Sequence, residues 1–228
     1  MKRSLTTLTV ASVLLCAVTY ADTAALNTNH LSYAMGYKTG EALKAQSVTI
    51  DTKQFAQGLE DSYTGNKPRV SDQEMQTVLT NMQKEMMKKM QDKYQQIAEQ
   101  NLTDGQKFLT DNAKKPGVVT TASGLQYKII NAGQGENPVA TDTVTVNYEG
   151  TLINGKVFDS SYQRGKPATF QVGQVIQGWQ EALKLMKPGA TWMLYIPSNL
   201  AYGKQGAMGA IGPNETLIFK VDLMSIKK

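Results

Sequence analysis

The spacing of the apolar residues changes along the chain and divides it into three regions. Residues 22 to about 70 carry apolar side chains at three- and four-residue steps in short stretches, which is typical of short amphipathic helices. Residues 71–115 continue this helical spacing in one uninterrupted run. Beyond residue 116 the step becomes two, which is typical of strands that bury one face. The pattern predicts a helical region, one long helix and a sheet domain, in that order.

The first region, residues 22–70, is predicted to hold short helices. The segment "LSYAMGYKTGEALKAQ" has apolar residues near helical spacing, although two glycines weaken the pattern. In "DTKQFAQGLEDSYTG", Asp51 suits a helix N-cap, because Gln54 follows three residues later. Gly65 suits the position where such a helix ends.

The second region, residues 71–115, is predicted to form one helix of about 40 residues, or about 60 Å at 1.5 Å per residue. Ser71 and Glu74 have the spacing of a capping box at its start. The repeating apolar positions are Met75, Val78, Leu79, Met82, Met86, Met90, Tyr94 and Ile97. Methionines in this pattern favour a helix core over a metal site, since thioethers alone select only soft ions such as Cu(I). An adaptable apolar binding face is a third interpretation.

The third region, residues 116–228, is predicted to form strands around a single helix. Pro116 and Gly117 end the long helix, and "TVTVNYEGTL" and "TLIFKVDLMSI" then alternate between apolar and polar residues. Asn154 and Gly155 lie between two apolar runs, which predicts a tight hairpin. The segment "QGWQEALKLMKPG" is the only helical stretch of this region. We expect an α+β domain in which an antiparallel sheet wraps around one short helix.

The N-terminus has the features of a signal peptide. Two basic residues precede an apolar run and a small-residue cleavage site, so we expect residues 1–21 to be removed after Ala21. An uncleaved anchor is less favoured because the apolar run is short and interrupted by threonines, and Leu15 before Cys16 argues against a lipoprotein. The sequence predicts an exported protein, in the periplasm or at the outer membrane or cell surface of a Gram-negative bacterium.

The charge and the cysteine and histidine content exclude several classes of partner and of catalytic site. The formal net charge of +5 falls to +3 when the two basic residues of the leader are removed, so nucleic acid is not an expected partner. Cys16 is the only cysteine, which leaves the mature chain without disulfides or thiol chemistry. His30 is the only histidine, so neither a His/Cys metal cluster nor a histidine-activated nucleophile is predicted beyond it. No cofactor is expected, and if the third region is an enzyme, we expect a reaction that needs neither a nucleophile nor a strong base.

Four motifs of the third region carry a specific resemblance. They are "VNYEGTLINGKVFDSS", "VIQGWQEAL", "GATWMLYIPSNLAYG" and "IGPNETLIFKVDL". In order and spacing they resemble the FKBP family of peptidyl-prolyl cis-trans isomerases, over residues 117–228. The leader, the helical region and the long connecting helix are also similar to the Mip/FkpA-type exported FKBPs. The resemblance implies an isomerase domain at residues 116–228, a dimerisation region at 22–70 and a connecting helix at 71–115.

The resemblance also implies a site. Trp179 is expected at the floor of a proline pocket, and the N–H of Ile176 and the hydroxyl of Tyr202 are expected to bond substrate or inhibitor carbonyls. The implied catalytic residues are Tyr148, Phe158, Asp159, Ile176, Trp179, Tyr202 and Phe219, and the implied substrate-binding residues are Val175 and Ile211. Ala168 stands where such families often carry an aromatic residue, and the loop between Phe170 and Val175 is shorter. The implied partners are proline-containing polypeptides, rapamycin-type macrolides as inhibitors and a second copy of the chain.

Two functions remain open at this point. The first is an isomerase that assists the folding of exported proteins by binding X-Pro segments in an apolar aromatic pocket. The second is a dimeric periplasmic chaperone that holds apolar client segments and isomerises them only secondarily. Several of the implied residues also have a structural interpretation: Phe158 and Phe219 as ordinary core, and Asp159 as a turn residue.

Overall fold

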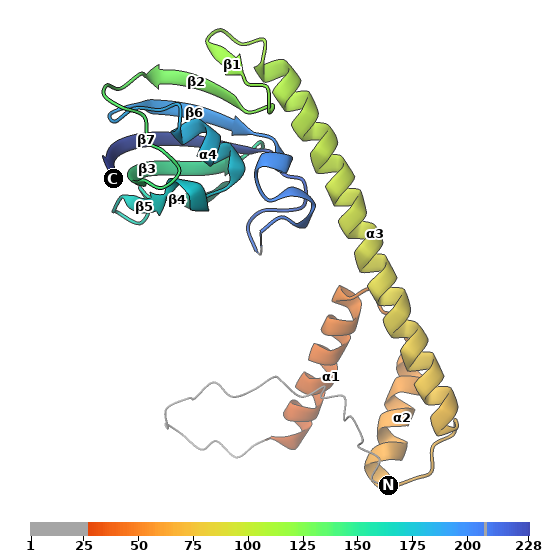
Figure 1. Ribbon diagram of the computed structural model, residues 1–228. Helices are drawn as coiled ribbons and strands as arrows, with labels where there is room; N and C mark the ends of the chain where they lie inside the picture. Colours follow the sequence, from red (N-terminus) through yellow and green to blue (C-terminus); the bar gives the residue numbers. More distant parts are fainter. Residues whose placement is uncertain (1–26, 208) are drawn as a thin grey trace, which may run out of the picture. The chain divides into compact units, whose positions relative to one another are not determined.

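The computed structural model of the 228-residue chain describes residues 27–207 and 209–228 (Figure 1). The predicted signal peptide, residues 1–21, and the first residues of the predicted 22–70 region lie outside this description. The chain divides into two compact units, the first ending at Asp72 and the second running from Gln73 to Lys228. None of the helices in the described residues is both long and apolar enough to cross a membrane.

The first unit contains two helices, α1 (Thr28–Ala45) and α2 (Thr52–Thr64). The predicted cap of α2 is confirmed, because Asp51 Oδ1 accepts hydrogen bonds from the N–H groups two and three residues later, at 2.8 and 3.1 Å. Gly65 ends α2 in the left-handed conformation, with φ of 77°. The start and the end of α2 therefore follow from these local signals.

Apolar side chains remain at the surface of the first unit. No residue of α1 is buried, and the exposed fraction reaches 64% for Leu59 and 91% for Tyr63 on α2. Two short helices cannot form a closed core of useful size by themselves. This unit therefore carries apolar surface that its own helices leave uncovered.

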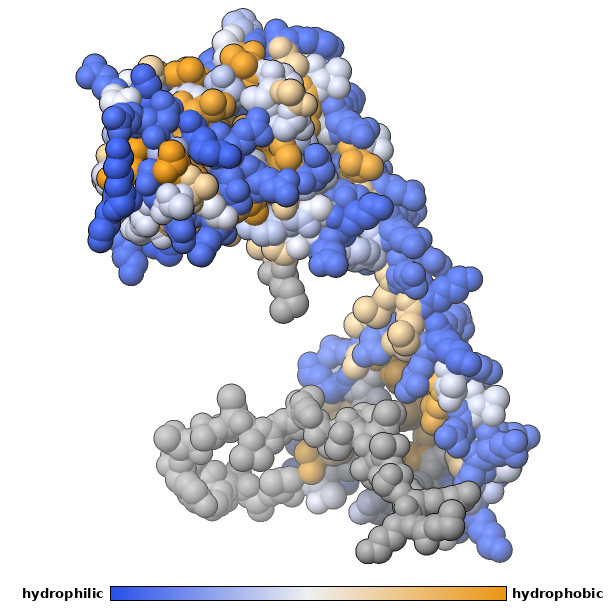
Figure 2. All heavy atoms as spheres, viewed as in Figure 1, coloured by the Kyte–Doolittle hydropathy of each residue, from blue (hydrophilic) through white to orange (hydrophobic). Residues whose placement is uncertain are grey.

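Helix α3 (Asp72–Asn112) is one continuous helix of 41 residues, as its apolar spacing predicts. Its methionines do not form a closed core within the chain: Met82 and Met86 are half-buried, and Met90 is 72% exposed. Figure 2 shows hydrophobic residues among hydrophilic ones at the surface of this part of the chain. The preferred interpretation of the methionines as helix core is thus not met by a single chain.

The rest of the second unit is a seven-stranded sheet in which every pairing is antiparallel. Its strand order is β1-β2-β6-β7-β3-β4, with β5 paired to β3. The helix α4 (Gln177–Leu183) lies against one face of this sheet (Figure 1). The predicted α+β class, a sheet around one short helix behind a helical region, is confirmed. The strands are β1 (Val118–Thr120), β2 (Gln126–Asn131), β3 (Thr143–Leu152), β4 (Val157–Ser160), β5 (Ala168–Gln171), β6 (Thr191–Ile196) and β7 (Leu217–Lys227).

The alternation in the sequence sets which face of the sheet is buried. Along β3, Val144, Val146 and Tyr148 are buried while the residues between them are half-exposed. Gly178 lets α4 approach this face closely, since a Cβ there would lie 2.5 Å from Cγ2 of Ile196. The same close approach buries the neighbouring Trp179, which is only 4% exposed. A glycine before the tryptophan is therefore a packing requirement.

The last turns of α3 belong to the packing of the sheet domain. The ring of Phe108 lies 6.0 Å from that of Tyr195 on β6. Asn112, at the end of the helix, is fully buried and donates to Gln126 Oε1 on β2 at 3.0 Å. Gln126 in turn donates to the carbonyl of Leu109 at 2.9 Å. These buried polar contacts fix the end of the helix against the sheet.

Candidate active site

A cavity of about 340 Å³ lies between α4 and the sheet face that it covers. This volume is within the usual range of small-ligand sites, about 300–1,000 Å³. Side chains from β3, β4, β5, β7 and α4 converge on it, together with the segments that precede α4 and follow β6. Its lining residues are Tyr148, Phe158, Asp159, Phe170, Gln174, Val175, Ile176, Trp179, Tyr202 and Phe219.

The indole of Trp179 is the centre of an aromatic wall. The rings of Tyr148, Phe170 and Phe219 stand nearly perpendicular to it, with centroids at 5.3, 5.9 and 5.2 Å. Such edge-to-face pairs place positive ring edges against negative ring faces, and each stabilises by about 0.5–1.5 kcal/mol beyond area burial. The indole Nε1 has no hydrogen-bond partner among the described residues. Ring contacts, rather than a hydrogen bond of its own, therefore hold the Trp179 indole in this wall.

Gly150 on β3 makes room for two of these rings. A Cβ at this position would lie 2.6 Å from Phe158 Cζ and 2.7 Å from Phe219 Cε1. The two phenyl rings are themselves edge-to-face, with centroids 5.5 Å apart. The missing side chain at residue 150 is therefore part of the shape of the cavity.

One corner of the cavity is polar. The hydroxyl of Tyr148 donates to Asp159 Oδ2 at 2.5 Å, and Arg164 forms an ion pair with Asp159 Oδ1. Arg164 also donates to the Tyr148 hydroxyl at 2.8 Å, with its guanidinium carbon 5.4 Å from the centre of that ring. The three side chains form a closed network in which the tyrosine ring is locked in place.

The network decides the protonation of both acids. Burial raises the pKa of Asp159, but the hydrogen bonds from Tyr148 and Arg164 and the positive charge outweigh it, so its pKa is below the usual range. Burial, followed by the hydrogen bond to Asp159, raises the pKa of Tyr148. At neutral pH the aspartate is charged and the tyrosine is a donor. Neither group is poised for proton transfer at that pH.

The start of α4 presents a backbone donor. Gln180 Nε2 donates to the carbonyl of Val175 at 2.7 Å and to that of Gly173 at 3.2 Å. Because C=O and N–H point in opposite directions across a trans peptide, the N–H of Ile176 points away from Gln180. This N–H has no partner among the described residues. It is a free donor on a residue that lines the cavity.

Tyr202 is the exposed edge of the cavity. It follows the 3-10 turn η2 (Ser198–Leu200), and 43% of its surface is exposed. A large aromatic residue at this level of exposure is not core packing. Across the described residues, no group of three or more His, Cys, Asp or Glu side chains is arranged to hold a metal ion. The site offers aromatic walls and a few fixed donors.

Comparisons with known proteins show the family of the chain. Residues 134–224 match the FKBP-type peptidyl-prolyl cis-trans isomerase family, and residues 28–129 match the domain amino terminal to FKBP-type peptidyl-prolyl isomerase. The "Peptidyl-prolyl cis-trans isomerase Mip" of Coxiella burnetii is 52% identical over 198 residues, which span 87% of this chain and 86% of the relative. The chain belongs to the FKBP-type peptidyl-prolyl cis-trans isomerases.

Other relatives of this FKBP place it in the Mip/FkpA group. The "Outer membrane protein MIP" of Legionella longbeachae is 48% identical over 212 residues, 93% of this chain and 91% of that protein. The crystal structure of FkpA from Escherichia coli has a TM-score of 0.77 at 37% identity, and the match covers 92% of this chain and 99% of that one. The protein is thus a peptidyl-prolyl cis-trans isomerase with the amino-terminal domain of that group.

The structure of the FKBP domain brings together eight of the nine site residues expected from the sequence. Ile211 is the exception, since it is buried in the loop bridge with Ala207 and does not line the cavity. Phe170 and Gln174 line the cavity but were not expected. Phe170 lies two residues beyond Ala168 on the same face of β5, so this strand does supply a ring.

Arg164 was also missed. It follows Asp159 by five residues in a polar turn, and an arginine in such a turn is ordinarily a solvated surface residue. No local spacing signal marks it as a partner of Tyr148. Only the fold of the segment after β4 brings its guanidinium to the polar corner.

Proposed function

We propose that the cavity beside Trp179 binds the proline of X-Pro segments and catalyses rotation about the preceding peptide bond. The uncatalysed barrier is about 18–20 kcal/mol, and unaided isomerisation takes about tens to hundreds of seconds. No covalent bond breaks in this reaction. The planar amide is stabilised by charge-separated resonance, which water favours and which twisting removes.

A dry aromatic cavity therefore favours the twisted amide over the planar one. This is differential binding of the transition state, achieved by excluding water. Trp179 forms the floor, and Phe158, Phe219 and Tyr148 form the walls. An acceleration of about 10⁶-fold needs about 8 kcal/mol, which binding and desolvation can supply without acid–base chemistry.

The polar groups orient the segment. The N–H of Ile176 and the hydroxyl of Tyr202 donate to carbonyls on either side of the proline. Asp159 holds Tyr148 in place, and its charge faces the carbonyl carbon of the bond that rotates. Val175 and Ile211 are proposed to contact substrate, Ile211 from the loop beyond the cavity wall. The observation that carries the proposal is the free Ile176 N–H beside an aromatic wall held edge-on to Trp179.

A protease-coupled assay on a Leu-Pro peptide tests this proposal. Tyr148→Phe is expected to lower kcat/KM by up to about 100-fold, the equivalent of a hydrogen bond to a charged group. Tyr162→Phe is the matched control, because that hydroxyl also bonds an aspartate, Asp222, but lies outside the cavity. A rapamycin-type macrolide is expected to block catalysis. Equal rates for the two variants, or no inhibition, would contradict the proposed pocket.

The exposed apolar surface of α1 and α2 supports a homodimer formed through residues 22–70. Leu59 and Tyr63 are largely exposed in the single chain, and pairing two copies would cover them. Light scattering at micromolar concentration tests this: the dimer mass is expected for the chain, and the monomer mass for Leu59→Asp. A monomeric parent chain would refute the dimer.

We also propose that the protein is exported and assists the folding of exported clients, in the periplasm or at the outer membrane of a Gram-negative bacterium. The predicted signal peptide supports export, and one relative carries the name of an outer membrane protein. Fractionation of the producing cell checks the compartment. Recovery of the uncleaved chain from the cytoplasm would refute it.

A client-holding chaperone is the second candidate. The specific observation in its favour is the exposed apolar stripe of α3, where Val78 and Met90 are 66% and 72% exposed. If Asp159→Ala abolishes isomerisation but leaves the suppression of client aggregation intact, holding is an independent activity. Equal loss of both activities would leave isomerisation as the sole function.

A further inference from the structure

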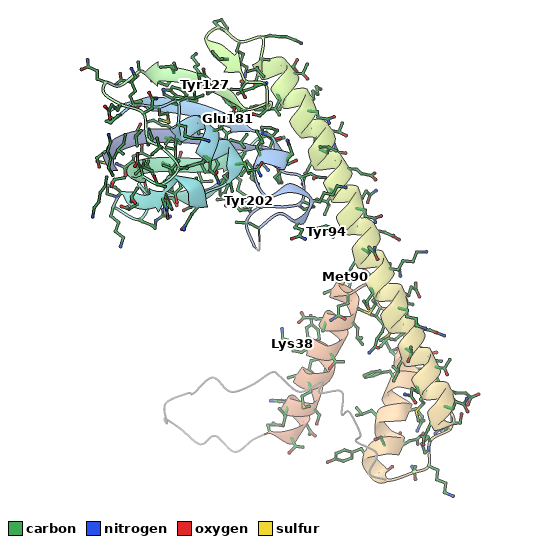
Figure 3. All side chains as sticks on the ribbon, in the orientation of Figure 1. Lys38, Met90, Tyr94, Tyr127, Glu181 and Tyr202 are labelled. Atoms are coloured by element: carbon green, nitrogen blue, oxygen red, sulfur yellow. The ribbon has the colours of Figure 1, made fainter. Side chains whose placement is uncertain are left out.

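The loop that follows Tyr202 rests on the long helix. Residues 203–215 are here called the Tyr202 loop; its described residues, 203–207 and 209–215, contain the turn η3 (Gly203–Gln205) and no strand. The hydroxyl of Tyr94 on α3 lies 2.9 Å from the carbonyl of Lys204 and 3.0 Å from that of Gln205. One hydroxyl proton is shared between these two acceptors. Figure 3 shows the Tyr94 side chain leaving α3 on the side of this loop.

A second contact is reciprocal. Asn101 Nδ2 donates to the carbonyl of Pro213 at 2.8 Å, and Asn214 Nδ2 donates back to the carbonyl of Ala98 on α3 at 3.0 Å. Each asparagine thus satisfies a backbone carbonyl of the other element. The end of the loop is fixed to α3 by two amide side chains in opposite directions.

A glycine allows this close approach. Gly105 on α3 is buried, and a Cβ there would overlap the side-chain oxygen of Thr216, the residue just after the loop. A side chain at this position would require the Thr216 side chain to rotate or the two elements to shift by a few tenths of an ångström. The helix is therefore in van der Waals contact with the loop as well as hydrogen-bonded to it.

The contacts continue through the loop to Tyr202. The N–H of Asn214, whose φ is 55°, donates to the carbonyl of Gly203 at 2.8 Å. Gly203 is the neighbour of Tyr202 in the chain. Ala207 and Ile211 exchange two backbone hydrogen bonds, at 2.9 and 3.2 Å, which close the loop. An unbroken path runs from α3 through Asn214 to the backbone that carries the Tyr202 ring.

We propose that Tyr94 and Asn101 of α3 are positioning residues of the isomerase site, acting through the Tyr202 loop. The inference rests on the proposed role of Tyr202 in binding substrate. A half-exposed tyrosine on an irregular loop otherwise loses conformational freedom when substrate binds, which lowers affinity. Because the loop is held on a rigid helix, Tyr202 already has its binding conformation before the substrate arrives. Helix α3 is thereby part of the catalytic unit.

Steady-state kinetics on the Leu-Pro peptide with the full chain test the proposal. Tyr94→Phe removes only the hydroxyl, and Asn101→Asp replaces the donor by a carboxylate that repels the Pro213 carbonyl. Each is expected to lower kcat/KM by about 5- to 100-fold, mainly through KM. Gln96→Glu, at an exposed position of the same helix, is the matched control and is expected to leave the kinetics unchanged.

A second measurement separates positioning from folding and from the proposed pocket. In the Tyr202→Ala background, Tyr94→Phe is expected to have no further effect, because both act on one group. If Tyr94→Phe lowers kcat/KM in the Tyr202→Ala background as much as in the parent chain, the positioning role is refuted. It is also refuted if Tyr94→Phe leaves the kinetics of the parent chain unchanged. In both cases the proposed role of Tyr202 in binding substrate stands. If Tyr202→Ala itself leaves kcat/KM unchanged, the proposed role of Tyr202 fails and the inference fails with it. If Asn101→Asp does not fold, the kinetics of Tyr94→Phe, a change at an exposed residue, still test the proposal.

Discussion

Replacing Gly150 by alanine tests the geometry of the aromatic wall with one methyl group. The new Cβ would lie 2.6 Å from Phe158 Cζ and 2.7 Å from Phe219 Cε1, whereas ordinary contact begins at 3.4 Å. The rings or the strand must therefore move by about 0.7–0.8 Å in a close-packed interior. Overpacking of this kind destabilises by about 1–3 kcal/mol. For a unit of this size that lowers Tm by about 2–12 °C.

The same substitution is also expected to slow catalysis. Both displaced rings line the cavity, so the wall that selects the twisted amide is misplaced. A misplacement of about 1 Å can lower a rate by about 100-fold. We expect kcat/KM of Gly150→Ala to fall by about 10- to 100-fold at temperatures where the variant is fully folded.

The assay pairs thermal unfolding with the protease-coupled measurement on the Leu-Pro peptide. Gly58→Ala on α2 is the control, because nothing lies within 4 Å of a Cβ at that position. It is expected to keep its kcat/KM. If Gly150→Ala retains both the Tm and the kcat/KM of the parent chain, the close packing of the rings around Gly150 is refuted.

The remaining predictions concern the polar groups. The pKa of Asp159 is below its usual value, so its contribution to stability is present above about pH 4 and is lost as the pH falls through the folded-state pKa. Urea unfolding between pH 7 and pH 3 should show a smaller acid loss for Asp159→Asn, and an identical pH profile would contradict the network. Asn112→Ala leaves Gln126 Oε1 buried without its donor, which should cost about 1–3 kcal/mol in urea unfolding; a change below about 0.5 kcal/mol would show that water replaces the amide. Asp159→Asn should also lower kcat/KM, because the amide no longer holds Tyr148 and Arg164 together; unchanged kinetics would mean that ring packing alone positions Tyr148.

Some features could be predicted because their causes are local in the sequence. The caps at Asp51 and Gly65, the length of α3 and the alternation along β3 and β7 depend on neighbours within a few residues. Four motifs in fixed order indicated the family. The resemblance to that family in turn predicted eight of the residues that line the cavity. Ile211 does not line the cavity, because spacing within a loop does not say on which side of the backbone bridge a side chain lies; its contact with substrate stays a prediction.

The missed residues have no local signal. Phe170 and Gln174 sit on a short strand and turn whose apolar pattern is too brief to assign a face. Arg164 is recognisable only beside Asp159 and Tyr148, which are 5 and 16 residues away along the chain. In the sequence, Gly150 is simply a glycine that weakens a strand. Its role in making room for Phe158 and Phe219 is visible only in the folded structure.

From the sequence follow the succession of a helical region, one long helix and a sheet domain, the buried faces of β3 and β7, and the isomerase family. These depend on periodicity and on motifs that are contiguous in the chain. Only the tertiary structure decided which rings meet at Trp179, how Arg164 closes the polar corner and that α3 holds the Tyr202 loop. Tyr94 and Lys204 are separated by 110 positions, and contacts at such separations arise from the packing of whole elements rather than from any local pattern.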